Sequence, residues 1–95
     1  MKVIFSPESE SDLEAIADYI AEDNPSKALD FIFELKEHCE NLASFPNRNP
    51  VYDEVEGLTV RKYPYKNYIV YYGAGDEFLY IFHIWHASRR QPSFK

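Results

Sequence analysis

The sequence contains one cysteine, Cys39, among its 95 residues. A lone cysteine cannot form an internal disulfide, and no cysteine and histidine residues have the spacing of a zinc site. The sequence also lacks the run of about 18 apolar residues that a membrane-spanning helix needs. We therefore expect packing alone to stabilise the fold, with Cys39 in the core, and we expect no metal ion and no membrane partner.

Glycine is also scarce, with three residues in the whole chain. The sequence has no glycine-rich nucleotide-binding loop, no nucleophile elbow and no carboxylate pair at catalytic spacing, so we expect no cofactor. The first residues, MKVIFSPESE, lack the basic and then apolar layout of a signal peptide, which predicts a cytoplasmic protein. A chain of this length with 45% hydrophobic content has room for one domain, residues 1–95.

Positive charge is scarce before residue 57 and in excess after it. Residues 1–56 contain 14 acidic and four basic side chains, whereas residues 57–95 contain two acidic and six basic ones. Salt screens exposed charges beyond about 8 Å, so a partner that binds one of these two parts interacts only weakly with the charges of the other. The net charge of −6 therefore does not by itself exclude nucleic acid as a partner.

Two helix-start signals lie in the first 43 residues. Ser6 and Asn24 are each followed by a proline, which combines a capping side chain with the residue that best fits the first helical position. We predict helices over Pro7–Glu22 and Pro25–Ala43, joined by a tight turn and packed as an antiparallel hairpin. Before them, the apolar and β-branched stretch Lys2–Phe5 predicts a strand.

The second predicted helix has more apolar residues than one buried stripe requires. Leu29, Phe31 and Phe33 add to a row that already has near-heptad spacing. The excess indicates either a central helix between the first helix and a sheet, or an exposed groove for a partner helix. The residues by themselves favour the central helix.

The remainder of the chain has the composition of a sheet. Ser44–Gly57, with its prolines and asparagines, is predicted to be a connecting loop. Leu58–Pro64, Asn67–Gly73 and Glu77–Ala87 are rich in β-branched and aromatic residues and predict an antiparallel meander. The predicted order is β-α-α-β-β-β, and the predicted fold class is α+β, an antiparallel sheet with the helical hairpin packed on one face.

The last predicted strand carries two histidines. Strict alternation places His83 on the face of Leu79 and Ile81, and His86 on the opposite face. The two histidines then point apart and cannot share a metal ion. We interpret His83 as a core residue and expect His86, where the strand ends, to face either a partner or solvent.

Basic residues gather near the end of this strand and on the first meander strand. Arg89 and Arg90 follow His86, and Arg61 and Lys62 align with the same region in the predicted sheet. Such a basic, tyrosine-lined face is able to contact nucleic acid, although lysines on exposed strands also commonly protect a sheet edge from pairing.

Four fragments in this order resemble the ParE/RelE superfamily of toxins from bacterial toxin–antitoxin operons, and the ParE branch most of all. They are NPSKALDFI, LASFP, TVRKYPYKNYIVYY and IFHIWHASRR. Together with the short strand and the helix pair predicted at the start of the chain, they make a resemblance over nearly the whole chain. The motif residues, in order, are Ala28, Phe31, Ile32, Leu42, Pro46, Tyr68, Val70, Tyr72, His86 and Arg89. One position departs from the pattern, because ParE-like endings usually have an acid where this chain has Arg90.

The resemblance implies a toxin that a cognate antitoxin neutralises, with one of two mechanisms. RelE-like members cut mRNA on the ribosome, and ParE-like members inhibit DNA gyrase without known catalysis of their own. The RelE-like cutters carry arginines about where Ile69 and Ala87 lie here, and neither of these residues can stabilise phosphate charge. We therefore favour gyrase inhibition, with no catalytic residues and with direct nucleic-acid contact not favoured.

The alternatives stay open at this point. One is a ribosome-dependent endoribonuclease, for which the nuclease set would be Arg61, Lys62, His86 and Arg89. Another is a small scaffold that only forms complexes. We also expect the ending Ser88–Lys95 to bind a partner and to be dispensable for the fold.

The resemblance also implies two groups of binding residues. The expected target-binding residues are Arg61, Lys62, Trp85, His86, Arg89 and Arg90. The expected antitoxin-binding residues are Leu29, Phe31 and Phe33, because antitoxins of this kind fold a disordered segment onto the toxin.

Overall fold

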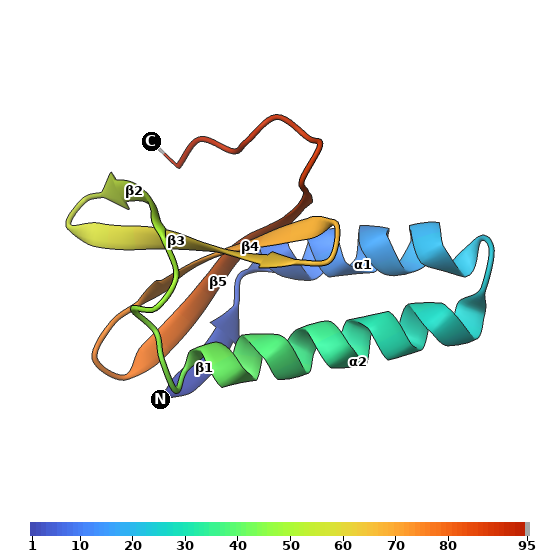
Figure 1. Cartoon of the computed structure of the whole chain (residues 1–95), viewed down its shortest axis with the longest axis horizontal. Helices are drawn as coiled ribbons and strands as arrows, with labels where there is room; N and C mark the ends of the chain where they lie inside the picture. Colours follow the sequence, from blue (N-terminus) through green and yellow to red (C-terminus); the bar gives the residue numbers. More distant parts are fainter. Residues whose placement is uncertain (95) are drawn as a thin grey trace.

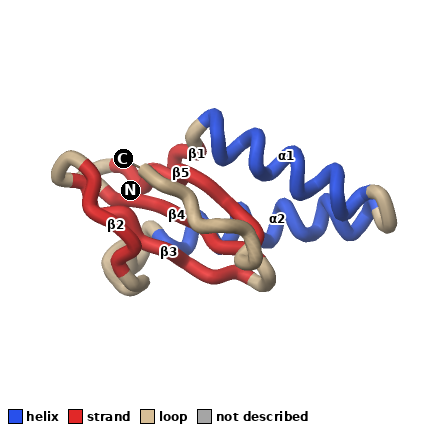
Figure 2. The backbone as a smooth tube through the Cα atoms, turned by 90° about the horizontal axis from the view of Figure 1, so that it is seen from above, coloured by secondary structure: helices blue, strands red, loops and turns tan. Residues whose placement is uncertain are grey.

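The computed structural model describes residues 1–94, and Lys95 lies outside the described residues. The described part consists of two helices and a five-stranded sheet (Figure 1). In chain order the elements are β1 (Lys2–Phe5), α1 (Pro7–Ala21), α2 (Pro25–Leu42), β2 (Val51–Val55), β3 (Leu58–Tyr65), β4 (Tyr68–Ala74) and β5 (Phe78–His86). The predicted α+β class is confirmed, and the far end of the helical hairpin extends beyond the sheet (Figure 2).

Both helices begin where their capping signals predict. The Ser6 side chain accepts a hydrogen bond from the Ser9 N–H at 2.9 Å, and the Asn24 side chain accepts one from the Lys27 N–H at 3.1 Å. Each bond satisfies a backbone donor that has no partner within its helix. Each helix ends one residue before its predicted end.

The sheet has one more strand than predicted. The segment Val51–Val55, which we predicted to be part of a loop, forms β2 and pairs with β3. A two-residue turn joins them, with φ of 50° at Glu56 and 83° at Gly57. Positive φ at both positions is the geometry that suits a tight β-hairpin, so the Glu-Gly pair was a hairpin signal that the loop prediction overlooked.

The sheet is also mixed instead of antiparallel, with the strand order β1-β5-β4-β3-β2. β1 runs parallel to β5, and Lys2–Phe5 lies opposite Phe78–Ile81. The helical hairpin and the meander lie between these strands in the chain, so no short turn forces them to be antiparallel. β1 covers only the first half of β5. Beyond it, the Ser6 N–H and hydroxyl donate to the carbonyls of Ile81 and Phe82 at 2.9 and 2.8 Å.

The core lies between the helices and the sheet. Its buried residues are Leu13, Ile16, Phe31, Leu35, Cys39, Leu42, Tyr65, Val70, Tyr72, Leu79, Ile81 and Ile84. The helices lie side by side on the sheet, because α1 itself contacts β5 and β1. The interpretation of α2 as a central helix between α1 and the sheet was wrong, since Leu29 and Phe33 of its surplus apolar residues are exposed.

An irregularity in β5 reverses the predicted alternation. Tyr72 of β4 pairs with Ile81, but the preceding Tyr71 pairs with His83, so Phe82 is an extra residue in β5. After such a bulge the side chains exchange faces. Ile84, which is 1% exposed, therefore joins Leu79 and Ile81 in the core. The placement of His83 on that face was wrong, although the two histidines do point apart.

Candidate functional site

The face of the sheet that points away from the helices is called the outer face here. The strand pairing aligns Lys62, Tyr71 and His83 in one row across it, and Pro64, Ile69 and Trp85 in the next row. Lys62 and Trp85 of the predicted target-binding set therefore share the outer face.

The end of β5 brings three of the predicted residues together. The Arg89 guanidinium lies over the Trp85 ring, 3.5 Å from its centroid, which is a favourable cation–π geometry. Both residues line one shallow hollow with His86, between α1 and the unpaired half of β5. Arg90 follows directly and is exposed.

His86 is held in a defined orientation in this hollow. The backbone N–H of Ser88 donates to its Nδ1 at 3.1 Å, and the Tyr68 ring lies 5.3 Å away. Because a backbone N–H is only a donor, Nδ1 of the neutral ring must be the acceptor, and Nε2 then carries the proton. The exposed imidazole therefore offers an N–H donor to a partner.

Arg61 lies apart from the residues at the end of β5. Its Nη1 donates to the Asn49 carbonyl at 2.7 Å, and its neighbour across the ladder is Tyr72. His86 pairs with Tyr68, which pairs with Tyr65, and Tyr65 lies about 13 Å along β3 from Arg61 at 3.3 Å per residue. Alternation along β3 also directs Arg61 and Lys62 to opposite faces of the sheet. The structure does not bring the four residues of the alternative nuclease set together.

The C-terminal segment, residues 87–94, runs back along the outer face, on the side of the sheet away from the helices (Figures 1 and 2). Pro92 is buried, and the Tyr52 hydroxyl donates to its carbonyl. The Phe94 ring contacts the rings of Tyr52, Tyr71, Phe82 and His83, with centroids 5.6 to 5.9 Å apart. This packing argues against our expectation that the ending is dispensable for the fold.

The aromatic cluster under the C-terminal segment was not predicted. Burial, followed by the nearby Tyr52, raises the pKa of Tyr71 above its ordinary value. Alternation along each strand indicates which side chains face outward. Nothing in the sequence indicates that the C-terminal segment packs over them.

Asp12 was not predicted either. Its Oδ2 accepts the backbone N–H of Ile84 at 2.9 Å and lies 3.0 Å from Nδ1 of His83. The carboxylate thus replaces a neighbouring strand at the unpaired half of β5. His83 is bound to this carboxylate and partly exposed, and is not the core residue that we expected.

The predicted antitoxin-binding residues of α2 separate into two groups. Phe31 is 8% exposed and packs on Tyr65 and Tyr68, with ring centroids 5.7 and 5.4 Å away. It belongs mainly to the core and also lines the groove that Lys66 crosses, so its assignment to antitoxin binding stays a prediction. Leu29 and Phe33 are 63% and 69% exposed.

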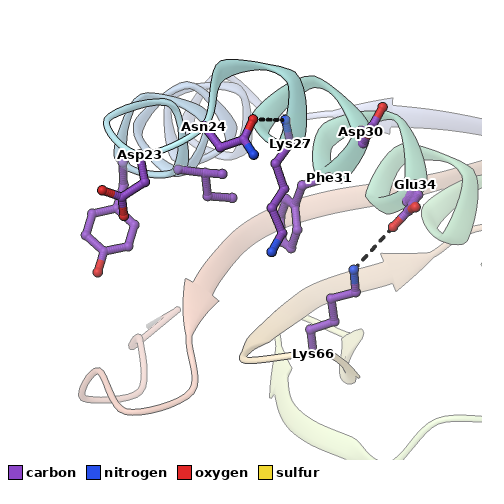
Figure 3. Close-up of a pocket in the computed structure, with 9 residues that line it drawn as sticks. Asp23, Asn24, Lys27, Asp30, Phe31, Glu34 and Lys66 are labelled. Atoms are coloured by element: carbon purple, nitrogen blue, oxygen red, sulfur yellow. Dashed lines mark hydrogen bonds and ion pairs between the residues drawn. The ribbon is translucent and has the colours of Figure 1, made fainter.

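A groove of about 600 Å³ lies between the turn of the helical hairpin and the β3–β4 turn (Figure 3). Lys66 crosses it, with Nζ 3.2 Å from Oε2 of Glu34 and 5.5 Å from the centre of the Phe31 ring. The hydrogen bond from Lys66, followed by that from Tyr65, holds the pKa of the exposed Glu34 below its ordinary value. The pair joins the β3–β4 turn to α2, and it is a surface ion pair of small energetic weight.

Within residues 1–94, no group of three or more histidine, cysteine, aspartate or glutamate residues is arranged to hold a metal ion. No helix in the same range is both long and apolar enough to cross a membrane.

The sequence matches the family model described as the ParE toxin of the type II toxin-antitoxin system, parDE, over residues 3–91. The chain belongs to the ParE toxin family. The resemblance that the motifs indicated is therefore confirmed, and the protein is a toxin of a type II toxin–antitoxin system. No curated protein sequence matches this toxin significantly.

A solved structure agrees with the fold of this ParE-family toxin. A chain from the structure titled "Chromosomal ParDE TA system from P. aeruginosa" superposes with a TM-score of 0.71 at 22% sequence identity. The match covers 90% of this chain and 95% of the other. At this identity the likeness concerns the fold alone, which both chains share over nearly their full lengths.

Proposed function

We propose that this ParE-family toxin acts in the cytoplasm by binding DNA gyrase and blocking its supercoiling activity, and that a cognate antitoxin neutralises it. The observation that carries the proposal is the group at the end of β5. Trp85, His86 and Arg89 line one hollow, with the guanidinium of Arg89 stacked on the Trp85 ring. Tryptophan and arginine are the residues most enriched at the centres of protein interfaces.

The arrangement suits binding better than bond cleavage. A ribonuclease needs its proton-transfer group and its phosphate-binding cations around one reacting phosphate. Here Arg61 donates to Asn49 on the helix side of the sheet, and Lys62 lies on the outer face. Only His86 and Arg89 of the alternative nuclease set lie together, which leaves ribosome-dependent mRNA cleavage as the less supported function.

We further propose that the antitoxin contacts Leu29 and Phe33 on α2. Both side chains are largely exposed and lie on the opposite layer from the C-terminal segment. A neutralising segment bound there is separate from the residues that we assign to gyrase.

The test compares the two mechanisms with one protein preparation. Purified toxin is added to a gyrase supercoiling reaction and, separately, to ribosomes that translate a defined mRNA. We expect loss of supercoiling and intact mRNA. Codon-phased mRNA cuts with normal supercoiling would contradict the proposal. Normal supercoiling and intact mRNA, with no growth arrest on expression, would indicate a scaffold.

A further inference from the structure

The outward face of α2 carries an apolar pair that nothing in the described chain covers. Leu29 and Phe33 are one helical turn apart, so their side chains are neighbours on the helix surface. They are 63% and 69% exposed, whereas the residues on the opposite side of α2 are buried in the core. We call this pair and its flanking residues the α2 ridge.

Acidic residues flank the apolar pair. Glu37 and Glu40 lie four and seven positions after Phe33, and Asp30 directly follows Leu29 and points out from the helix (Figure 3). All three carboxylates are exposed, and none forms an ion pair within residues 1–94. The nearby Lys36 leans toward β1, with its Nζ 5.4 Å from the centre of the Phe5 ring.

These charges limit what can cover the α2 ridge. A second copy of the toxin would bring its own three carboxylates against this set, and like charges that meet across an interface oppose association. A partner helix with two or three apolar residues on one face and lysine or arginine on both sides would cover Leu29 and Phe33 and pair with the three carboxylates.

We propose that the α2 ridge binds a basic amphipathic helix, and that the neutralising segment of the antitoxin has this composition. The proposal rests on the proposed function for the identity of the partner. It goes beyond that function because it specifies the charge of the segment: the acidic ridge selects a cationic helix. Its apolar anchors lie on Leu29 and Phe33, and its cations lie next to Asp30, Glu37 and Glu40.

The test uses two synthetic peptides of 18 residues that differ only in charge. Both carry leucines at helical spacing; one has lysines and the other glutamates beside them. Each is labelled and titrated with the full toxin by fluorescence anisotropy, at low and at physiological salt. We expect the lysine peptide to bind and the glutamate peptide to bind at least about tenfold more weakly, with a difference that shrinks as salt rises.

Variants of the toxin locate the binding surface. Phe33→Ser should lower the affinity of the toxin for the lysine peptide at least about tenfold, as loss of an interface anchor does. The triple change Asp30→Asn, Glu37→Gln and Glu40→Gln should lower this affinity several-fold and make it less dependent on salt. The matched control removes three exposed carboxylates of α1 (Glu8→Gln, Glu10→Gln and Glu14→Gln) and should leave binding nearly unchanged.

Several results would overturn the proposal. They are equal affinity for the two peptides, no binding of either, equal losses from the α1 and α2 triple variants, or a toxin dimer that Phe33→Ser dissociates. The supercoiling assay is independent of these titrations, because it needs neither peptide. Failure of the peptide test with intact gyrase inhibition would therefore remove the charge assignment and leave the proposed function standing.

Discussion

At the scale of single residues, Asp12 has the clearest structural role outside the core. It provides the acceptor for the Ile84 N–H where β5 has no neighbouring strand, and it also binds His83. Asp12→Ala leaves that N–H without its partner, and we expect the free energy of unfolding to fall by about 1–3 kcal/mol. The measurement is urea denaturation followed by circular dichroism.

Glu14→Ala is the control for Asp12, because Glu14 is an exposed acid on the same helix. The free energy of unfolding of Asp12→Asn should lie between those of the two alanine variants. Its side-chain carbonyl still accepts the N–H but carries no charge toward His83. If Asp12→Ala unfolds at the same urea concentration as Glu14→Ala, the role of Asp12 at the strand edge is wrong.

Cys39 illustrates a residue whose sequence interpretation is confirmed. It is fully buried, and burial raises the pKa of its thiol from 9.0 to about 12. The thiolate population at pH 8 is then about 1,000-fold smaller than for a free cysteine, before the lack of access is considered. We expect iodoacetamide to label the urea-unfolded protein in minutes and the folded protein at least about 1,000-fold more slowly, by mass spectrometry. Comparable labelling rates would show that Cys39 is accessible.

At the scale of elements, the sequence predicts what local chemistry decides. Ser6 and Asn24 cap their helices as their residue types require, and helical periodicity identifies the buried stripe. The sequence did not reveal the bulge at Phe82, because apolar residues fill β5 on both sides of it. Two prolines before Val51 favoured a loop, so β2 was not predicted. The parallel pairing of β1 with β5 was not predicted either, because it depends on contacts between residues distant in sequence.

Composition also explains which parts of the candidate site were predictable. The sequence analysis proposed His86 and Arg89 as binding residues because they are polar residues at the end of an apolar strand, and their role stays a prediction. Buried Phe31 was grouped with exposed Leu29 and Phe33 because exposed and buried phenylalanines look alike in a helix whose apolar residues occur all round. Asp12 was missed because α1 has many acids, and nothing local distinguishes the one that reaches β5.

The C-terminal segment behaves as an additional element that packs on the outer face. Phe94→Ala removes a half-buried ring that contacts four others, and we expect a loss of about 1–2 kcal/mol in unfolding free energy. Urea denaturation measures the loss, with the exposed neighbour Ser93→Ala as control. Equal stability of the two variants would mean that the segment contributes nothing to the fold.

At the scale of the whole molecule, the two layers carry different surfaces. The helical layer is acidic and presents Leu29 and Phe33, whereas the end of β5 presents Trp85, His86 and Arg89. Of the 14 acidic residues before position 57, eleven lie in the helical hairpin and three lie in β2 and its turn. Such a molecule is suited to two partners of different chemistry, one on α2 and one at the end of β5.

The central claim is that this ParE-family toxin inhibits gyrase through the end of β5, and supercoiling assays on three variants test it most directly. Trp85→Ala and Arg89→Ala should each raise the toxin concentration for half-maximal inhibition at least about tenfold. Phe33→Ala, which removes an exposed aromatic ring from α2, should inhibit like the unchanged toxin. Circular dichroism is the control that checks that all three variants are folded. Full inhibition by both β5 variants, or an equal loss in Phe33→Ala, would contradict the account.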